Sequence, residues 1–166
     1  MSNPIDTSFI QMINKHVCIA VKISRVYGKY GEEREDLLQE MMYQLWRSYS
    51  SFDHRSKFST WMYRVCLNTA LSYSRKTSRQ KVDSISLKHD NIPDPAIDNL
   101  EESIALLYDA IGTLTPVNKA VIMLFLEELS YEEIAKITGL SRSNVSVRLV
   151  RIKKELGKLI KKKLTP

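Results

Sequence analysis

Cysteine and histidine are scarce in this sequence, and their spacing excludes several kinds of structure. The 166 residues include two cysteines, Cys18 and Cys66, and three histidines. Zinc sites and disulfide-rich folds need closely spaced sets of these residues, such as Cys-x-x-Cys pairs, and the sequence has none. We therefore expect no metal, no cofactor and no disulfide. Because apolar residues at helical spacing surround both cysteines, we expect both thiols to be buried and unreactive.

Long hydrophobic runs are also missing. The longest, AVIMLFL at residues 120–126, is far too short to cross a bilayer, and we expect it to form a buried helix. The first ten residues, MSNPIDTSFI, lack the basic start and apolar stretch of a signal peptide. With the unpaired cysteines, these features predict a cytoplasmic protein without membrane insertion.

The residue sets of common enzyme sites are absent as well. We find no paired carboxylates of the acid–base kind, no nucleophile beside a base and no glycine-rich phosphate loop. We therefore expect neither enzyme activity nor a small-molecule substrate. The chain does have a formal net charge of +6 and a hydrophobic fraction of 43%. This combination predicts packed cores and an anionic partner such as nucleic acid.

Apolar residues recur at the spacing of an α-helix along most of the chain. No segment alternates with a period of two for long enough to predict a strand, so the expected fold is all-α. A third helix should begin near Phe58–Thr60 and end near Arg79. The first two helices should cover residues 8–29 and 34–49, with core-facing positions at Ile10, Ile13, Val17 and Val21, and then at Leu37, Leu38, Met41, Met42, Leu45 and Trp46.

The composition changes between the two halves of the chain. The stretch SISLKHDNIPDPAIDNLEE is rich in acids, and its prolines, Pro93 and Pro95, disfavour helix just before them. A long internal loop in one domain would also fit, but loops of this length are uncommon in compact domains. The sequence therefore predicts two small helical domains at 1–80 and 101–166, joined by a flexible acidic linker at 81–100.

The segment SYEEIAKITGLSRSNVSVRLVRIKKEL has the local signals of a helix-turn-helix. Ser130 and Glu133 match a capping box at the start of a short helix. Gly139 suits the left-handed turn that ends this helix, and Ser141 suits the cap of the next one. We therefore expect the second helix to enter the major groove of DNA.

The second helix of this motif sorts into two faces. Val145, Leu149 and Ile152 begin an apolar stripe that continues to Leu156 and Leu159 and should face the core. Asparagine and arginine can make bidentate contacts with base edges, although a basic solvated face would have the same composition. The expected DNA contacts are Arg142, Ser143, Asn144, Ser146, Val147, Arg148 and Arg151.

Two stretches carry a resemblance to a known family. Residues 35–71 contain Asp-Leu-x-Gln-Glu followed by Leu-Trp, Phe-x-Thr-Trp-x-x-Arg and Asn-Thr-Ala, and they resemble the second conserved region of bacterial sigma factors. Residues 114–141 and the helix after them resemble the fourth region. The two occur in the family's order with no third region between them. This layout resembles the small extracytoplasmic-function (ECF) sigma factors of the sigma-70 family.

The resemblance implies partners and sites. The partners would be core RNA polymerase, promoter DNA and an anti-sigma factor, in the bacterial cytoplasm. The fourth region would read the −35 element through the helix-turn-helix. In the second region, the polymerase-docking positions would be Asp36, Gln39, Glu40, Leu45 and Trp46. The −10 element would be opened and bound through Lys57, Phe58, Trp61, Arg64, Asn68 and Arg75.

Some interpretations stay open at this point. Trp61 and Phe58 fit either the core or base capture, and Asp36 could simply stabilise a helix start. Leu67 and Ser72 depart from the family's common arginine and aspartate, so contacts through these positions are in doubt. Two rival functions are a stand-alone helix-turn-helix regulator and a sigma-like protein that sequesters an anti-sigma factor.

Overall fold

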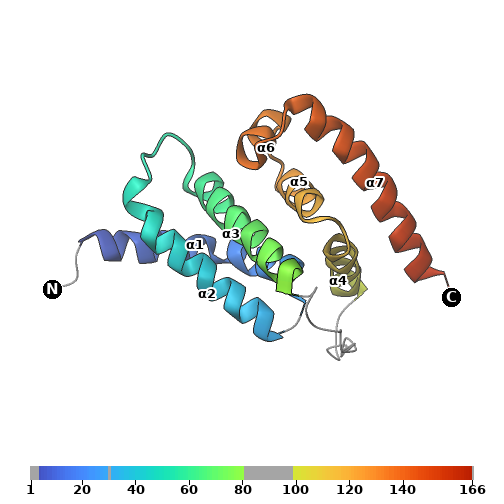
Figure 1. Cartoon of the computed structure of the whole chain (residues 1–166), viewed down its shortest axis with the longest axis horizontal. Coiled ribbons are helices and arrows are strands. Elements are labelled where there is room, and N and C mark those ends of the chain that lie inside the picture. Colours follow the sequence, from blue (N-terminus) through green and yellow to red (C-terminus); the bar gives the residue numbers. More distant parts are fainter. Residues whose placement is uncertain (1–3, 30, 81–98, 166) are drawn as a thin grey trace. The chain divides into compact units, whose positions relative to one another are not determined.

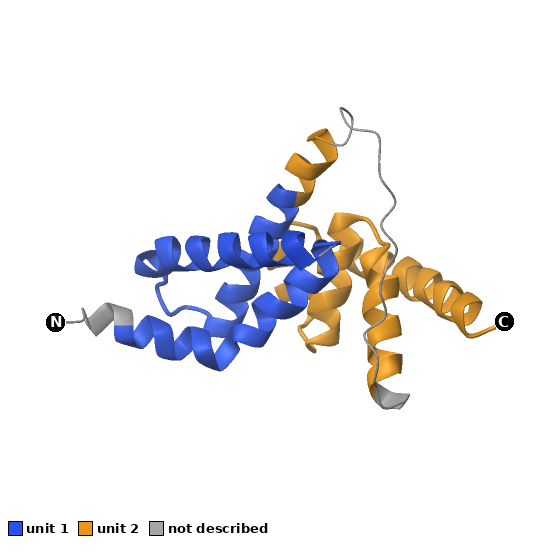
Figure 2. Ribbon diagram, turned by 90° about the horizontal axis from the view of Figure 1, so that it is seen from below, with its two compact units in different colours: residues 1–73 blue, residues 74–166 orange. Residues whose placement is uncertain are grey.

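The computed structural model describes residues 4–29, 31–80 and 99–165, and in these residues it contains helices and no strand. This confirms the all-α prediction. The chain divides into two compact units, residues 1–73 and 74–166 (Figure 2). The predicted linker lies almost entirely outside the described residues, so its boundaries stay a prediction. The elements, labelled in Figure 1, are α1 Pro4–Tyr27, α2 Gly31–Ser48, η1 Tyr49–Ser51, α3 Phe58–Gln80, α4 Asn99–Gly112, α5 Pro116–Leu126, α6 Tyr131–Thr138 and α7 Arg142–Leu164.

The core of unit 1 comes from one face each of α1, α2 and the part of α3 up to residue 73. Helix α2 buries Leu37, Met41 and Leu45, which lie four apart on one stripe as predicted. Trp46, which was also predicted to face the core, is exposed. Helix α3 begins at Phe58 and ends within one residue of the predicted position. The largest fully buried side chains of the unit are Ile23, Leu37, Met41, Leu45, Met62 and Leu67.

The predicted core face of α1 is largely wrong. Ile13 is buried, but Ile10, Val17 and Val21 are exposed. The buried stripe instead includes Ile23. Helix α1 carries apolar residues on more than one face, and periodicity alone does not say which face meets a neighbour.

The turn between α1 and α2 depends on a glycine. A Cβ atom added to Gly28 would lie 2.9 Å from the carbonyl oxygen of Ser24 and 2.8 Å from Cγ of Arg34. The Nε atom of Arg34 donates to the Gly28 carbonyl at 3.1 Å, and the Gly28 amide donates to the Ser24 carbonyl at 2.8 Å. The Ser24 carbonyl belongs to the backbone of α1 and cannot move away from a Cβ atom. The close approach of the two helices therefore requires glycine at position 28.

The two cysteines differ in their surroundings, which corrects the prediction that both are buried. Cys66 is buried in α3, and burial raises the pKa of its thiol to about 12. Cys18 is exposed on α1. The error has the same origin as the error in the α1 stripe, because Cys18 follows Val17 on the exposed side of the helix.

This difference predicts selective labelling of the thiols. At pH 8, iodoacetamide should modify one thiol per folded chain, at Cys18, because the reactive species is the thiolate and Cys66 is both buried and protonated. Mass spectrometry of tryptic peptides gives the measurement. Denaturant should make both cysteines reactive, and equal labelling of the two in the folded chain would contradict the packing of α3.

Unit 2 is built around α5, which carries the longest apolar run of the chain. Residues 120–124 are all buried, as expected of a helix that is apolar on every side. Pro116 occupies the first turn, where a helix does not need its missing amide. Helices α4 and α5 both pack against α7, and Figure 1 shows α7 extending past both of them.

None of the described helices combines the length and hydropathy needed to cross a membrane. Within the same ranges, no group of three or more histidine, cysteine or carboxylate side chains is placed to hold a metal ion.

Candidate nucleic-acid interface

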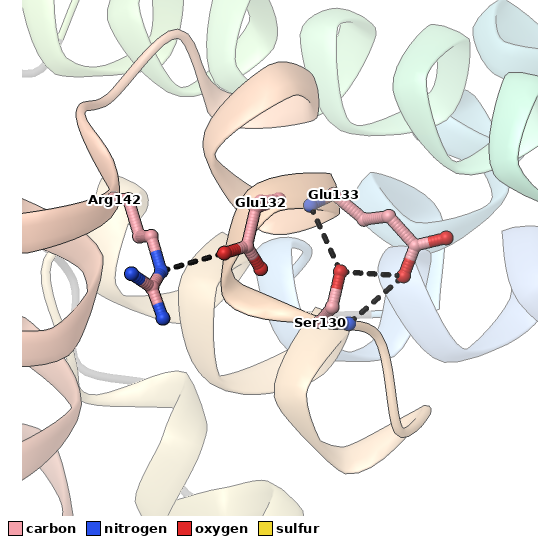
Figure 3. Close-up of polar contacts among 4 residues, drawn as sticks. All are labelled: Ser130, Glu132, Glu133 and Arg142. Carbon is pink, nitrogen blue, oxygen red and sulfur yellow. Dashed lines mark hydrogen bonds and ion pairs between the residues drawn. The ribbon is translucent and has the colours of Figure 1, made fainter.

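Helix α6 begins with the predicted capping box (Figure 3). The Ser130 hydroxyl accepts a hydrogen bond from the Glu133 amide at 3.2 Å, and the Glu133 carboxylate accepts from the Ser130 amide at 2.9 Å. Gly139 ends the helix with a φ of 73°, a left-handed conformation that favours glycine. Ser141 then caps α7 by accepting from the Asn144 amide at 3.2 Å. These contacts confirm the helix-turn-helix.

The two predicted faces of α7 are separated in the structure. Val145, Leu149, Ile152 and Leu156 are buried against the rest of unit 2. On the other side of the helix the predicted contact residues reach solvent. Ser143, Asn144, Val147 and Arg151 are exposed, and Ser146 and Arg148 are half-buried.

Arg142 lies at the start of α7 and is paired within the motif. Its Nε atom lies 2.6 Å from Oε1 of Glu132, a residue of the first turn of α6, as Figure 3 shows. Both side chains are largely exposed, and exposed ion pairs contribute about 0–1 kcal/mol. Arg142 can therefore exchange Glu132 for a phosphate at little cost.

Arg148 is more constrained than the sequence pattern suggested. Its Nε atom donates to Oδ1 of Asn144 at 2.9 Å, and its Nη1 atom donates to Oδ1 of Asn118 at 2.8 Å. Asn118 belongs to the first turn of α5 and is half-buried. Sequence reasoning did not include Asn118 in the site, because no local pattern links residues that are 30 positions apart.

The basic side chains of α7 continue beyond Arg151, the last of the predicted DNA contacts. The helix runs without interruption to Leu164, which at 1.5 Å per residue gives a length of about 34 Å. Lys153 is held above the Phe125 ring, 4.0 Å from its centroid. The other lysines of this part are exposed and form a basic extension that suits phosphate contacts, at Lys154, Lys158, Lys161, Lys162 and Lys163.

The predicted −10 residues lie in α3, apart from Lys57, which directly precedes it, and they differ in how far they are exposed. Lys57, Arg64, Asn68 and Arg75 are exposed, and the last three share the face implied by their spacing. Phe58 is buried, which places it in the core. Trp61 is half-buried, so it packs against neighbours and keeps an accessible part.

The aromatic cluster around Trp61 was not predicted as a unit. The Trp61 ring lies 5.1 Å from that of Phe52 and 6.2 Å from that of Tyr49, measured between centroids. Phe52 also contacts His54 in the loop that precedes α3, with the ring centroids 4.4 Å apart and the ring planes tilted by 52°. The signal in the sequence was the string YSSFDH, but it lies between the predicted second and third helices, so no single helical pattern connected it to Trp61.

A second histidine borders the same cluster. His16 of α1 lies 5.4 Å from the Phe58 ring. Desolvation, with a smaller effect from Lys15, lowers the pKa of His16 below its ordinary value. The imidazole is therefore neutral at physiological pH and packs as an aromatic side chain.

The predicted polymerase-docking positions on α2 do not all share one surface. Asp36, Gln39, Glu40 and Trp46 are exposed, whereas Leu45 is fully buried. We therefore leave Leu45 out of the surface, because its whole side chain belongs to the core. Tyr43, which the sequence pattern did not single out, is exposed on the turn between Glu40 and Trp46.

Comparison with known proteins matches both halves of the chain. Residues 12–80 match the family described as Sigma-70 region 2, and residues 104–156 match Sigma-70, region 4. The ECF RNA polymerase sigma-E factor of Haemophilus influenzae is 30% identical over 160 residues, which cover 87% of this chain and 82% of that protein. SigE of Mycolicibacterium smegmatis, an ECF RNA polymerase sigma factor, is 25% identical over 90% of this chain, which spans 60% of its length.

The fold also matches a solved structure. Sigma factor RpoE from Bartonella quintana, crystallised in complex with the anti-sigma factor NepR, aligns with a TM-score of 0.75 at 22% identity. The alignment covers 93% of this chain and 97% of that one.

Sigma-70 regions 2 and 4 in one all-helical chain define a sigma factor of the sigma-70 class. The similarity to the ECF sigma-E factor of Haemophilus influenzae identifies the subfamily within this class. The chain belongs to the ECF family of RNA polymerase sigma factors.

Proposed function

We propose that this sigma factor binds core RNA polymerase and directs it to promoters by contacting the −35 element with α7 and the −10 element with α3. The observation that carries the proposal is the outward face of α7. Its start is capped by Ser141 and its opposite face is buried. The exposed side chains on the outward face are Ser143, Asn144, Val147 and Arg151. Asparagine and arginine on such a face can bind base edges, and the lysines that follow can bind phosphates.

Unit 1 supplies the surface that binds core RNA polymerase in this proposal. Asp36, Gln39, Glu40, Tyr43 and Trp46 of α2 form the surface that we assign to the polymerase, and we call it the α2 surface. Tryptophan and tyrosine are enriched in protein interfaces and among the contacts that contribute most to binding.

Strand opening is assigned to α3 and the aromatic cluster. Arg64, Asn68 and Arg75 supply exposed polar and cationic groups along one face of α3. Trp61 keeps an accessible part on which an unstacked base can be placed. Stacking on an aromatic side chain contributes about 1–3 kcal/mol per base, which offsets the cost of unstacking.

An anti-sigma factor is a further proposed partner. The B. quintana structure contains such a protein. In this chain, the exposed side chains of Val17 and Val21 on α1 offer an apolar surface that an inhibitor can cover.

A mobility-shift experiment tests the proposal against a stand-alone regulator. Genomic DNA fragments are incubated with the chain, with core polymerase, or with both at the same salt concentration. We expect sequence-specific complexes only when both proteins are present, because each half-site contact is weak and the two act together in the holoenzyme. Specific shifts by the chain alone would identify a stand-alone helix-turn-helix regulator.

A further inference from the structure

The structural feature that carries a further inference is the position of Arg148 between two asparagines. Its guanidinium bridges Asn144, on its own helix, and Asn118, on α5, through hydrogen bonds of 2.9 and 2.8 Å. Arg148 and Asn118 are half-buried, whereas Asn144 is exposed. The bridge therefore connects α5 to a side chain on the proposed DNA-reading face of α7.

The chemistry of the bridge fixes the orientation of the Asn144 amide. A guanidinium has donors only, so the group that each asparagine turns toward Arg148 must be its oxygen. The Asn144 Nδ2 group, on the other branch of the same amide, is then directed away from Arg148. The Asn144 backbone is also held, because its amide donates to the Ser141 hydroxyl at 3.2 Å.

We propose that Asn118 is a positioning residue that determines base preference at the −35 element, an inference that rests on the proposed function. Asn118 holds Arg148, and Arg148 holds Asn144 with its Nδ2 donor facing the groove. A donor at this position selects the acceptors of the major groove, which are N7 and O6 of guanine, N7 of adenine and O4 of thymine. It disfavours cytosine, which presents the N4 donor there.

Without the Asn118 oxygen, Arg148 loses the contact that anchors it to α5. Its guanidinium can then move on a flexible side chain, and the Asn144 amide can rotate to present either its donor or its acceptor. Discrimination against cytosine should fall by about fivefold at the single base position that Asn144 faces, the effect of one hydrogen bond of ordinary strength. The −10 preferences should not change.

Run-off transcription from a promoter library with a randomised −35 element tests this inference. The holoenzyme is assembled from core polymerase and the full chain, unaltered or carrying Asn118→Ala, Asn118→Leu, Asn118→Asp, Asn144→Ala or both Asn118→Ala and Asn144→Ala. Asn118→Leu fills nearly the same volume without an acceptor, which separates packing from hydrogen bonding. Asn14→Ala, at an exposed asparagine of α1, is the matched control.

We expect Asn118→Ala and Asn118→Leu to lose base preference at the position defined by Asn144→Ala. Asn118→Asp should keep the preference, because its carboxylate also accepts from Arg148. In the Asn144→Ala background, removing Asn118 should have no further effect on preference. A uniform loss of transcription with unchanged base preferences, or a preference change that persists without Asn144, would overturn the inference.

These outcomes are distinct from a failure of the proposed function. If the unaltered chain directs no transcript from any member of the library, initiation itself is disproved. If it directs selective transcription and the Asn118 variants match the Asn14→Ala control, only the positioning role is disproved.

Discussion

Trp46→Ala is expected to weaken binding of core RNA polymerase by more than about tenfold while leaving the Tm of the chain unchanged. The Trp46 side chain is 61% exposed, so the fold of unit 1 gains little from it. Buried at an interface, the same indole removes a large apolar area from water, and tryptophan is the residue type most enriched among energetically dominant contacts. The measurement is a fluorescence anisotropy titration of the labelled chain with core polymerase, with thermal unfolding followed in parallel.

One further variant, with a control on another helix, tests the extent of the α2 surface. The double substitution Gln39→Ala and Glu40→Ala should also weaken core binding, because it removes exposed polar groups from the same surface. Ile10→Ala is the control, since Ile10 is 55% exposed but lies on α1. Unchanged core affinity for Trp46→Ala, with an intact fold, would show that the polymerase binds elsewhere.

Leu149→Ala is expected to reduce the free energy of unfolding of unit 2 by about 2–5 kcal/mol. Leu149 is 1% exposed and lies in the middle of the buried stripe of α7. Its removal leaves a cavity in a unit with a small core, so a large part of the total stability is lost. Urea denaturation followed by circular dichroism, with the two units fitted separately, gives the measurement.

The adjacent residue provides a sensitive control for the orientation of α7. Val150 is 69% exposed, and Val150→Ala should change the free energy of unfolding by less than about 0.5 kcal/mol. A shift of one residue in the assignment of the helix faces would reverse the two results. Equal destabilisation by both substitutions would therefore contradict the packing of α7 in unit 2.

The features that sequence reasoning predicted well have local causes. Ser130, Glu133, Gly139 and Ser141 act within a few residues of themselves, through hydrogen bonds and a backbone conformation that any helix of this kind needs. The buried stripe of α7 was equally predictable, because its helix has one apolar face and one polar face.

The features that sequence reasoning missed depend on contacts between distant segments. Periodicity placed Leu45 and Trp46 together at the core, although one is fully buried and the other largely exposed. Val17 on α1 had the correct spacing for a core that lies on the other side of the helix. The hydrogen bond between Asn118 and Arg148 depends on the packing of α5 against α7, which no local pattern records.

The central claim is that this chain gives core polymerase its promoter specificity, and run-off transcription measures this most directly. Purified core polymerase is mixed with a genomic promoter library, with and without the chain, and the transcripts are sequenced. We predict that transcripts start at a defined set of promoters only when the chain is present, and that these promoters share −35 and −10 elements at a fixed spacing. Measurable binding of the chain to core polymerase without any promoter-dependent transcript would contradict the account and favour a protein that sequesters an anti-sigma factor.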